Sequence, residues 1–169
     1  IIGILDSENI NFLDAKLFGM RNGYCLDFIT ISDQSGQMIK KNSTIANSLT
    51  TRLIEALDQE ILMPKIVQRR QPRHLKHFDT DTIIEYKHDM THRWTEMDIK
   101  TSDRPGLLAS ICKVFLDHGA LIKKARIATY GERAEDKFCI TSKENTPFLK
   151  KTELEKLIND MNVSLSKKK

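Results

Sequence analysis

The stretch TSDRPGLL, residues 101–108, joins the two patterns that decide the fold of this chain. Before it, apolar and polar residues alternate from 95 to 100, which predicts a half-buried strand. After it, apolar residues recur at helical spacing as far as His118, and Gly119 is a natural helix stop. Pro105 suits the first helical position, where a missing N–H has no partner to lose. The stretch therefore predicts a strand, a short loop and a helix that starts at Pro105.

Outward from this stretch, the C-terminal half is predicted to form one unit of strands and helices. Leu121 to Tyr130 predicts a second strand, Gly131 lies in the turn that follows, and Phe138 and Ile140 mark a third strand. A second helical stripe consists of Leu154, Leu157, Ile158 and Met161. A short last strand is expected at 163–165. This β-α-β-β-α-β order is the ferredoxin-like plan, an α+β fold.

The N-terminal half repeats the pattern. Residues 5–16 align with 115–126 at an offset of 110, and residues 27–31 align with 136–140 at an offset of 109. The one-residue change falls in a turn, where insertions are tolerated. We therefore expect two ferredoxin-like units in tandem. The predicted domains are 1–90 and 91–169.

The first unit is incomplete in the sequence. Its expected elements are a helix end at 1–8, strands at 10–18 and 24–32, turns at 22–23 and 33–36, a helix at 43–62, a basic connector at 65–78 and a last strand at 82–88. The first strand and the start of the first helix are missing. In this plan that strand is central, and unpaired buried backbone groups are costly. We therefore expect the chain to begin inside a larger protein.

Composition narrows the class of protein. With 40% hydrophobic and 30% charged residues, the chain is typical of a soluble globular protein. No apolar run approaches the roughly 20 residues of a membrane helix. The three cysteines have no C-x-x-C spacing, which favours reduced core thiols in the cytoplasm. A net charge of +4 is too mild to indicate nucleic-acid binding by itself.

The loop before the helix has the residue types that a binding site for a free amino acid requires. N–H groups at a helix start bind carboxylates, and Gly106 lets a ligand approach the backbone closely. Asp103 could pair with an ammonium group. An ordinary capped turn explains the same residues, so the motif alone leaves both interpretations open.

A resemblance to known families adds to this interpretation. The second unit is similar to an ACT domain, an amino-acid-sensing ferredoxin-like module, and the tandem resembles the C-terminal end of the bifunctional uridylyltransferase/uridylyl-removing enzymes. The residues that carry the resemblance are 103–109 (DRPGLLA), 125–129 (ARIAT), 131–133 (GER) and 135–136 (ED), with 26–27 and 33–36 in the first unit and 68–70, 72–73 and 75–78 in the connector.

The resemblance implies a glutamine sensor in nitrogen metabolism. In that family the tandem responds to free glutamine and controls two activities on the PII signalling protein: uridylylation from UTP by a nucleotidyltransferase domain, and uridylyl removal by a metal-dependent hydrolase domain. The parent enzyme uses magnesium by analogy. We expect no catalytic site and no cofactor in this chain itself, while a homodimer remains open.

The resemblance also implies a ligand site between the two units. ACT ligands lie where the loop of one unit faces the start of strand two in the other, where the family often has an asparagine. Asn11 occupies that position here, and its amide can donate and accept hydrogen bonds. Leu121, at the matching position of the other unit, can do neither. A solvated strand-edge role for Asn11 stays open. The expected ligand-binding residues are Asp103, Arg104, Pro105, Gly106, Leu107, Leu108 and Asn11.

Other polar motifs give weaker evidence for a functional site. His74 and His77, and His88 and His92, have spacings that a metal can use, but no acid or cysteine cluster completes a set, so we expect no metal site. The basic connector could favour a nucleic-acid-binding module that uses the same sheet. A purely dimerising ferredoxin-like module is the third possibility.

Overall fold

A computed structural model describes residues 1–8, 10–20, 24–33, 35–58 and 81–166. The basic connector, the predicted turn at 22–23 and the pair His74 and His77 fall outside the described residues, wholly or in part. The helices are α1 (Ile2–Ser7), α2 (Thr44–Asp58), α3 (Leu107–Asp117) and α4 (Lys151–Leu165). The strands are β1 (Asn11–Gly19), β2 (Cys25–Ser32), β3 (Ile83–Asp89), β4 (Trp94–Ser102), β5 (Leu121–Tyr130) and β6 (Arg133–Thr141).

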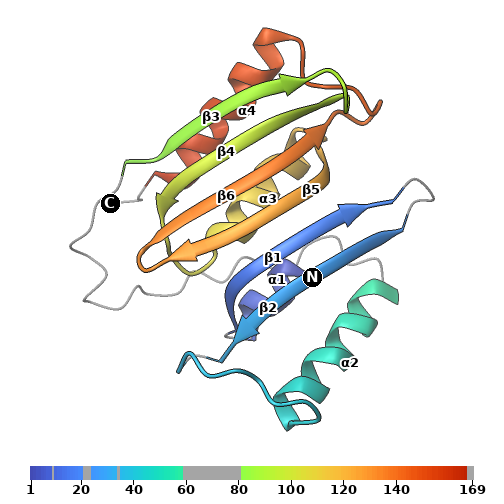
Figure 1. Ribbon diagram of the computed structural model, residues 1–169, viewed down its shortest axis with the longest axis vertical. Helices are drawn as coiled ribbons and strands as arrows, with labels where there is room; N and C mark the ends of the chain where they lie inside the picture. The colour runs from blue at the N-terminus through green and yellow to red at the C-terminus, as the bar shows by residue number, and fades with distance from the viewer. Residues whose placement is uncertain (9, 21–23, 34, 59–80, 167–169) are drawn as a thin grey trace.

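The strands form one six-stranded sheet with the order β2-β1-β5-β6-β4-β3, and every neighbouring pair is antiparallel. In Figure 1, α3 and α4 lie behind the half of the sheet that contains β4, β5 and β6. The α+β class expected from the sequence is therefore confirmed, and the arrangement is compatible with ferredoxin-like ACT units.

The main core lies between this half of the sheet and the helices α3 and α4. The alternation predicted for 95–100 is present, because Thr95, Met97 and Ile99 are fully buried and their neighbours are not. Phe115 of α3 meets Phe138 of β6 edge to face, with ring centroids 5.0 Å apart. The predicted stripe on α4 is buried in the same core, at Leu154, Leu157, Met161 and, half-buried, Ile158. Apolar periodicity thus places these elements correctly.

Two predicted strands differ from the structure: one is helical, and the other pairs with a strand of the C-terminal half. The expected strand at 163–165 is wrong: α4 continues to Leu165, which extends the apolar stripe of that helix into the core. The sheet position beside β4 belongs to β3 instead. β3 is the strand that the sequence predicts at 82–88, as the last strand of the first unit. It pairs with β4 through a short turn, and a short loop costs little closure entropy.

The start of α3 also differs from the prediction. Pro105 lies in the preceding turn, and the helix begins at Leu107 with Gly106 as its N-cap. Gly106 has φ 76°, a left-handed conformation that glycine adopts without steric cost. The Leu107 N–H donates to the Arg104 carbonyl at 3.1 Å, which closes the turn. The proline therefore shapes the loop and not the first helical turn.

Two strands that the sequence alignment of the halves predicts to be equivalent, β1 and β5, pair with each other. β1 runs antiparallel to β5, from Asp14 opposite Ala128 to Phe18 opposite Lys124. At the centre of this ladder the small side chains Ala15 and Ala125 are buried. Behind them α1 packs against α3. The halves of the chain are thus joined along a backbone ladder.

In the described part of the chain β2 is an edge strand of the sheet, and a smaller hydrophobic core lies beside it. Ile4, Leu5, Ile10 and Leu49 are buried there between α1, the start of β1 and α2. Within the described residues, the ladder partner of β2 is β1. The upstream strand expected from the sequence stays a prediction, as do the domain bounds. No helix in the described part of the chain is long and apolar enough to span a membrane.

Candidate functional site

One end of the sheet gathers the residues that the sequence analysis selected. β4 ends there at Ser102, β5 turns into β6 through Gly131, and β1 begins at Asn11 (Figure 1). The register of the β1–β5 ladder produces this arrangement, because Asp14 lies opposite Ala128, near the end of β5. Asn11 and the loop after β4 therefore share one end of the sheet, with the ends of β5 and β6 between them.

The loop at this end is held from both sides. The Asp103 N–H donates to the Glu132 carbonyl in the β5–β6 turn at 2.8 Å. On the helix side, the Ser110 hydroxyl donates to the Gly106 carbonyl at 2.8 Å. No described side chain caps the first turn of α3. A fixed loop followed by a helix start without a side-chain cap is suited to a ligand carboxylate.

Arg104 has a structural partner. Its Nη2 donates to the Ser164 carbonyl in the last turn of α4 at 2.9 Å. Burial lowers the pKa of the guanidinium group. Arginine side chains in general keep their positive charge in proteins. A cation at a helix C-terminus stabilises the carbonyl groups that have no partner within the helix. Arg104 therefore fastens the loop to α4, and its predicted ligand contact is untested.

Replacing Arg104 by alanine should lower the free energy of unfolding by about 1.5–3 kcal/mol, the usual effect of a lost charge-assisted hydrogen bond. Denaturant unfolding followed by the fluorescence of Trp94, the single tryptophan, measures this. Arg126→Ala, at an exposed position of β5, is the matched control and should change the value by less than about 0.5 kcal/mol. Equal losses in both variants would contradict the role given to Arg104.

Asn11 also has a partner. Its Nδ2 donates to the Asp33 carbonyl at 2.9 Å, which ties the start of β1 to the end of β2. The side chain is exposed, so a ligand can reach it. Leu121 begins β5 at the opposite end of the sheet. The strand-edge role that the sequence left open for Asn11 therefore has a specific contact, the hydrogen bond to the Asp33 carbonyl.

Two carboxyl groups of this half of the chain, Asp103 in the loop and Asp136 inside the sheet on β6, are poorly solvated. Burial raises the pKa of Asp103 above its ordinary value, and burial raises the pKa of Asp136 to about 7. The negative charge of Asp103 adds to the increase at Asp136. Asp136 is 3% exposed, and the Ala128 N–H donates to its Oδ1 at a long 3.4 Å.

The sequence analysis names Asp136 only as a residue that carries the family resemblance, and not as a candidate site residue. A signal was available, because Ala134, Asp136, Phe138 and Ile140 all fall on the buried face of β6, and an acid interrupts that apolar series. Charged residues are almost never fully buried unless they are paired. An acid at an inward position is therefore a candidate for function.

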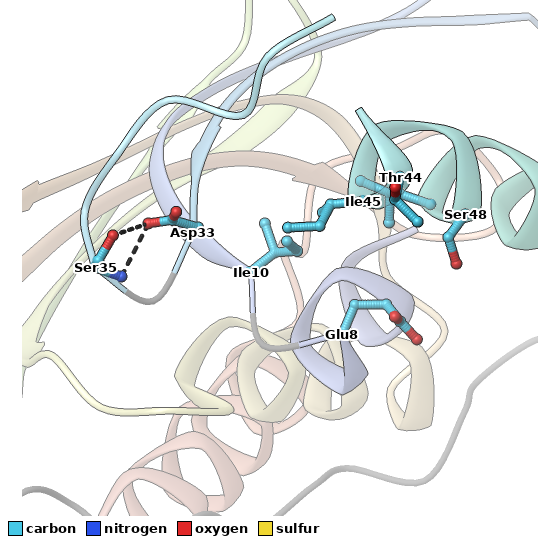
Figure 2. A pocket seen from close by; sticks show the side chains of 8 residues that line it. Glu8, Ile10, Asp33, Ser35, Thr44, Ile45 and Ser48 are labelled. Atoms are coloured by element: carbon cyan, nitrogen blue, oxygen red, sulfur yellow. Dashed lines mark hydrogen bonds between the residues drawn. The ribbon is translucent and has the colours of Figure 1, made fainter. Parts of the chain in front are cut away.

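The sequence analysis also missed a cavity of about 550 Å³ in the N-terminal half. It is lined by Glu8, Ile10, Asp33, Ser35, Thr44, Ile45, Ser48 and Leu49 (Figure 2). Its acids already have partners. Asp33 Oδ1 accepts from the Ser35 N–H at 2.9 Å and the Ser35 hydroxyl at 2.7 Å, and Glu8 pairs with Arg52. The cavity adjoins Ile10, next to Asn11, but none of the predicted ligand residues lines it.

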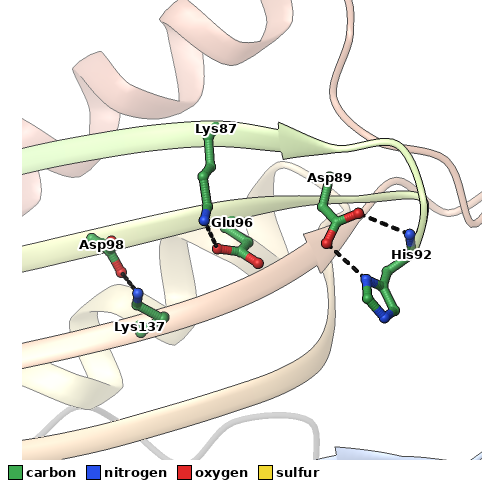
Figure 3. Close-up of polar contacts among 6 residues, drawn as sticks. All are labelled: Lys87, Asp89, His92, Glu96, Asp98 and Lys137. Atoms are coloured by element: carbon green, nitrogen blue, oxygen red, sulfur yellow. Dashed lines mark hydrogen bonds and ion pairs between the residues drawn. The ribbon is translucent and has the colours of Figure 1, made fainter.

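The open face of the sheet carries paired charges. Lys87 of β3 forms an ion pair with Glu96 of β4 at 2.9 Å, and Lys137 of β6 forms one with Asp98 of β4 at 3.2 Å (Figure 3). Each pair joins two neighbouring strands. Opposite charges on neighbouring strands satisfy one another, which is typical of a solvated sheet face.

His88 and His92, on and after β3, also have polar partners. His92 binds Asp89 at 2.7 Å and stacks on Trp94, and His88 Nδ1 lies 3.1 Å from the Thr95 hydroxyl. In the described ranges no group of three or more His, Cys, Asp or Glu side chains could hold a metal ion. The magnesium that the resemblance implies belongs to the parent enzyme and stays a prediction.

Similarity of sequence, and not of structure, relates this chain to known proteins. No protein-family profile matches the chain, and no solved structure matches it. The bifunctional uridylyltransferase/uridylyl-removing enzymes of Azotobacter vinelandii and Pseudomonas fluorescens are each 36% identical to it over 146 residues, which is 86% of this chain and 16% of the relative. The Acinetobacter baumannii enzyme is 35% identical over 149 residues, with the same coverage.

The chain therefore spans about a sixth of the length of these curated relatives. The identity covers most of the chain and matches the resemblance expected from the sequence, which is confirmed. This chain belongs, as one segment, to the family of the bifunctional uridylyltransferase/uridylyl-removing enzymes.

Proposed function

We propose that this chain is the glutamine-sensing tandem ACT region at the C-terminal end of a bifunctional PII uridylyltransferase/uridylyl-removing enzyme of the cytoplasm. Its similarity to enzymes of that name supports the proposal. So does the edge-to-edge pairing of the repeat-equivalent strands β1 and β5, because ACT ligands lie where two units meet.

The observation that carries the proposal is the shared end of the sheet. The loop of one unit and Asn11 of the other lie there together. In the proposed complex, the uncapped first turn of α3 binds the α-carboxylate of glutamine. Asp103 pairs with the α-ammonium group. The exposed amide of Asn11 reaches the ligand from the first unit.

Regulation follows from a ligand that touches both units. Such a ligand binds best to the arrangement that closes the site, so it shifts the population toward that arrangement. In the proposed enzyme, this shift favours uridylyl removal from PII over transfer from UTP. Both reactions belong to domains outside this chain, and the chain contributes the sensor.

Glutamine should raise the melting temperature of this chain, and glutamate should do so much less. At a free concentration 100 times the dissociation constant, one site adds about 2.7 kcal/mol to the free energy of unfolding. Thermal unfolding with a panel of free amino acids measures the effect. Asp103→Ala should weaken glutamine binding roughly 10- to 100-fold, because an ion pair to the ammonium group is lost.

Asp117→Ala is the matched control, since Asp117 is exposed on α3 and pairs with Lys113 on the solvent side. It should leave glutamine affinity unchanged. A folded chain whose melting temperature does not respond to any amino acid would contradict the sensor. Steep, salt-dependent retention on heparin would then favour the nucleic-acid module, and self-association without an amino-acid effect would favour the dimerising module.

A further inference from the structure

Three exposed cations gather on the open face of the sheet, along the ladder between β1 and β5. Lys16 of β1 lies directly opposite Arg126 of β5. Successive side chains of a strand point to opposite faces, and the neighbours Ala15 and Ala125 are buried in the core, so both cations point to the open face. Lys124, two residues before Arg126, points the same way. In Figure 1 the two strands run side by side, and α3 lies behind the sheet.

These three cations have no acidic partner, in contrast to others on the same face. Four ion pairs cover β3, β4 and β6: Lys87–Glu96, Lys100–Glu85, Lys137–Asp98 and Arg133–Glu135. Within the described part of the chain, the side chains of Lys16, Lys124 and Arg126 form no ion pair. Asp14, two residues from Lys16, reduces the surplus charge but does not cancel it. Like charges at facing strand positions destabilise a sheet, so an anion from outside the chain would be favoured here.

Two aromatic rings lie beside the cations. Phe28 of β2 is directly opposite Lys16, and Phe18 is two residues from Lys16 on β1. The rings meet edge to face with centroids 6.4 Å apart, and the two residues are 58% and 37% exposed. Exposed aromatic rings on a sheet are platforms on which unpaired bases stack, and neighbouring cations contact the phosphates.

We propose that this surface, named the seam patch (Lys16, Phe18, Phe28, Lys124 and Arg126), binds single-stranded nucleic acid. The bases stack on the two rings, and the phosphates lie against the three cations. A single strand is favoured over a duplex, because its bases are free to leave their neighbours and stack on the protein. The seam patch contains none of the expected glutamine-binding residues, so this inference does not rest on the proposed function.

The three cations set the expected salt dependence. Three phosphate contacts to a single strand give a slope of about −2 in a plot of log affinity against log salt, so affinity should fall roughly 20-fold between about 50 and about 200 mM salt. Arg126→Ala should make the slope less steep by about 0.7, the effect of one lost phosphate contact. Arg126 is exposed, so this variant keeps the fold.

The aromatic pair sets a different effect. Phe28→Leu keeps an apolar side chain at an exposed position but removes the ring. It should lower the affinity at least about fivefold, because stacking of one base contributes about 1–3 kcal/mol, and it should leave the salt slope unchanged. A general loss of structure would not separate affinity from salt slope in this way.

The experiment is fluorescence anisotropy of labelled oligouridylate and oligothymidylate, each of about 12 nucleotides, titrated with the whole chain at salt concentrations from about 50 to about 200 mM. Dissociation constants of roughly 1–100 μM are expected. The DNA duplex of the same length should bind more weakly than either single strand. Polyglutamate and phosphatidylserine vesicles, which offer negative charge without bases, should compete poorly.

Lys87→Ala is the matched control. It removes the same charge from the open face, but β3 is three strands from β5, about 14 Å and beyond the Debye length at about 0.1 M salt. Its affinity and salt slope should equal those of the wild-type chain. No binding by the folded wild-type chain at about 50 mM salt overturns the inference.

Binding that neither Arg126→Ala nor Phe28→Leu weakens belongs to another basic segment, such as the connector, and also overturns it. Equal competition by polyglutamate or by vesicles would show an acidic protein or a membrane as the partner instead. Glutamine stabilisation is measured on the same chain without oligonucleotide, so the proposed function stands or fails separately.

Discussion

Replacing Phe138 by alanine should lower the free energy of unfolding of this chain by about 3–5 kcal/mol. Phe138 is fully buried in β6, and its ring meets Phe115 of α3 edge to face at 5.0 Å. The substitution removes the transfer free energy of the ring and leaves a space between β6 and the helices that the packed neighbours fill only in part. It also removes the aromatic pair, which adds about 0.5–1.5 kcal/mol in general.

Denaturant unfolding detected through Trp94 measures this loss, because Trp94 lies at the start of β4 beside β6. Phe28→Ala is the control. Phe28 is 58% exposed on β2 and also makes an edge-to-face pair, with Phe18. It should cost less than about 1.5 kcal/mol, since little apolar surface is returned to water. Similar losses at Phe138 and Phe28 would show that the core does not lie between β6 and α3.

Replacing Asp136 by asparagine should stabilise the chain above pH 7 by a few kcal/mol and leave it nearly unchanged near pH 4. Burial raises the pKa of this carboxyl from its ordinary value to about 7. The folded chain therefore holds a proton that the unfolded chain releases at about pH 4. The stability contributed by this proton is fully present below pH 4 and is lost as the pH rises through 7. Asparagine resembles the neutral carboxyl and carries no proton to lose.

Urea unfolding of both chains at pH values from 4 to 8 tests this. The wild-type free energy of unfolding should fall with increasing pH more steeply than that of the variant. Asp27 and Asp103, whose pKa values burial also raises, leave a residual slope of the same sign in the variant. Asp117→Asn, at an exposed helical position, should keep the wild-type slope. Parallel slopes for the wild-type chain and Asp136→Asn would contradict a buried protonated acid at this position.

The sequence predicted the elements of the second unit well. The predicted strand from Leu121 to Tyr130 matches β5 residue for residue, and Gly131 and Gly119 adopt positive φ values at the expected turn and helix stop. The inward side chains of β4 and the stripe of α4 are buried as expected. These features depend on residues a few positions apart, which is the range over which helical and strand periodicity act.

The structure locates the residues of the candidate site. The loop from Asp103 to Leu108 and Asn11 lie at one end of the sheet, with the ends of β5 and β6 between them. Their role in binding stays a prediction. Asp136 was missed, because an acid in a strand is usually solvated, and only the helices packed over β6 make this one buried.

The α+β class and most of the local order of strands and helices were determined by the sequence alone. Three features depended on tertiary structure: the pairing of β1 with β5, the position of β3 beside β4, and the helical end of α4 in place of a last strand. A strand pairs with whichever partner satisfies its backbone groups and buries its apolar face, and those partners are distant in the chain. Local periodicity carries no information about which distant edge is available, so the packed sheet decided these three features.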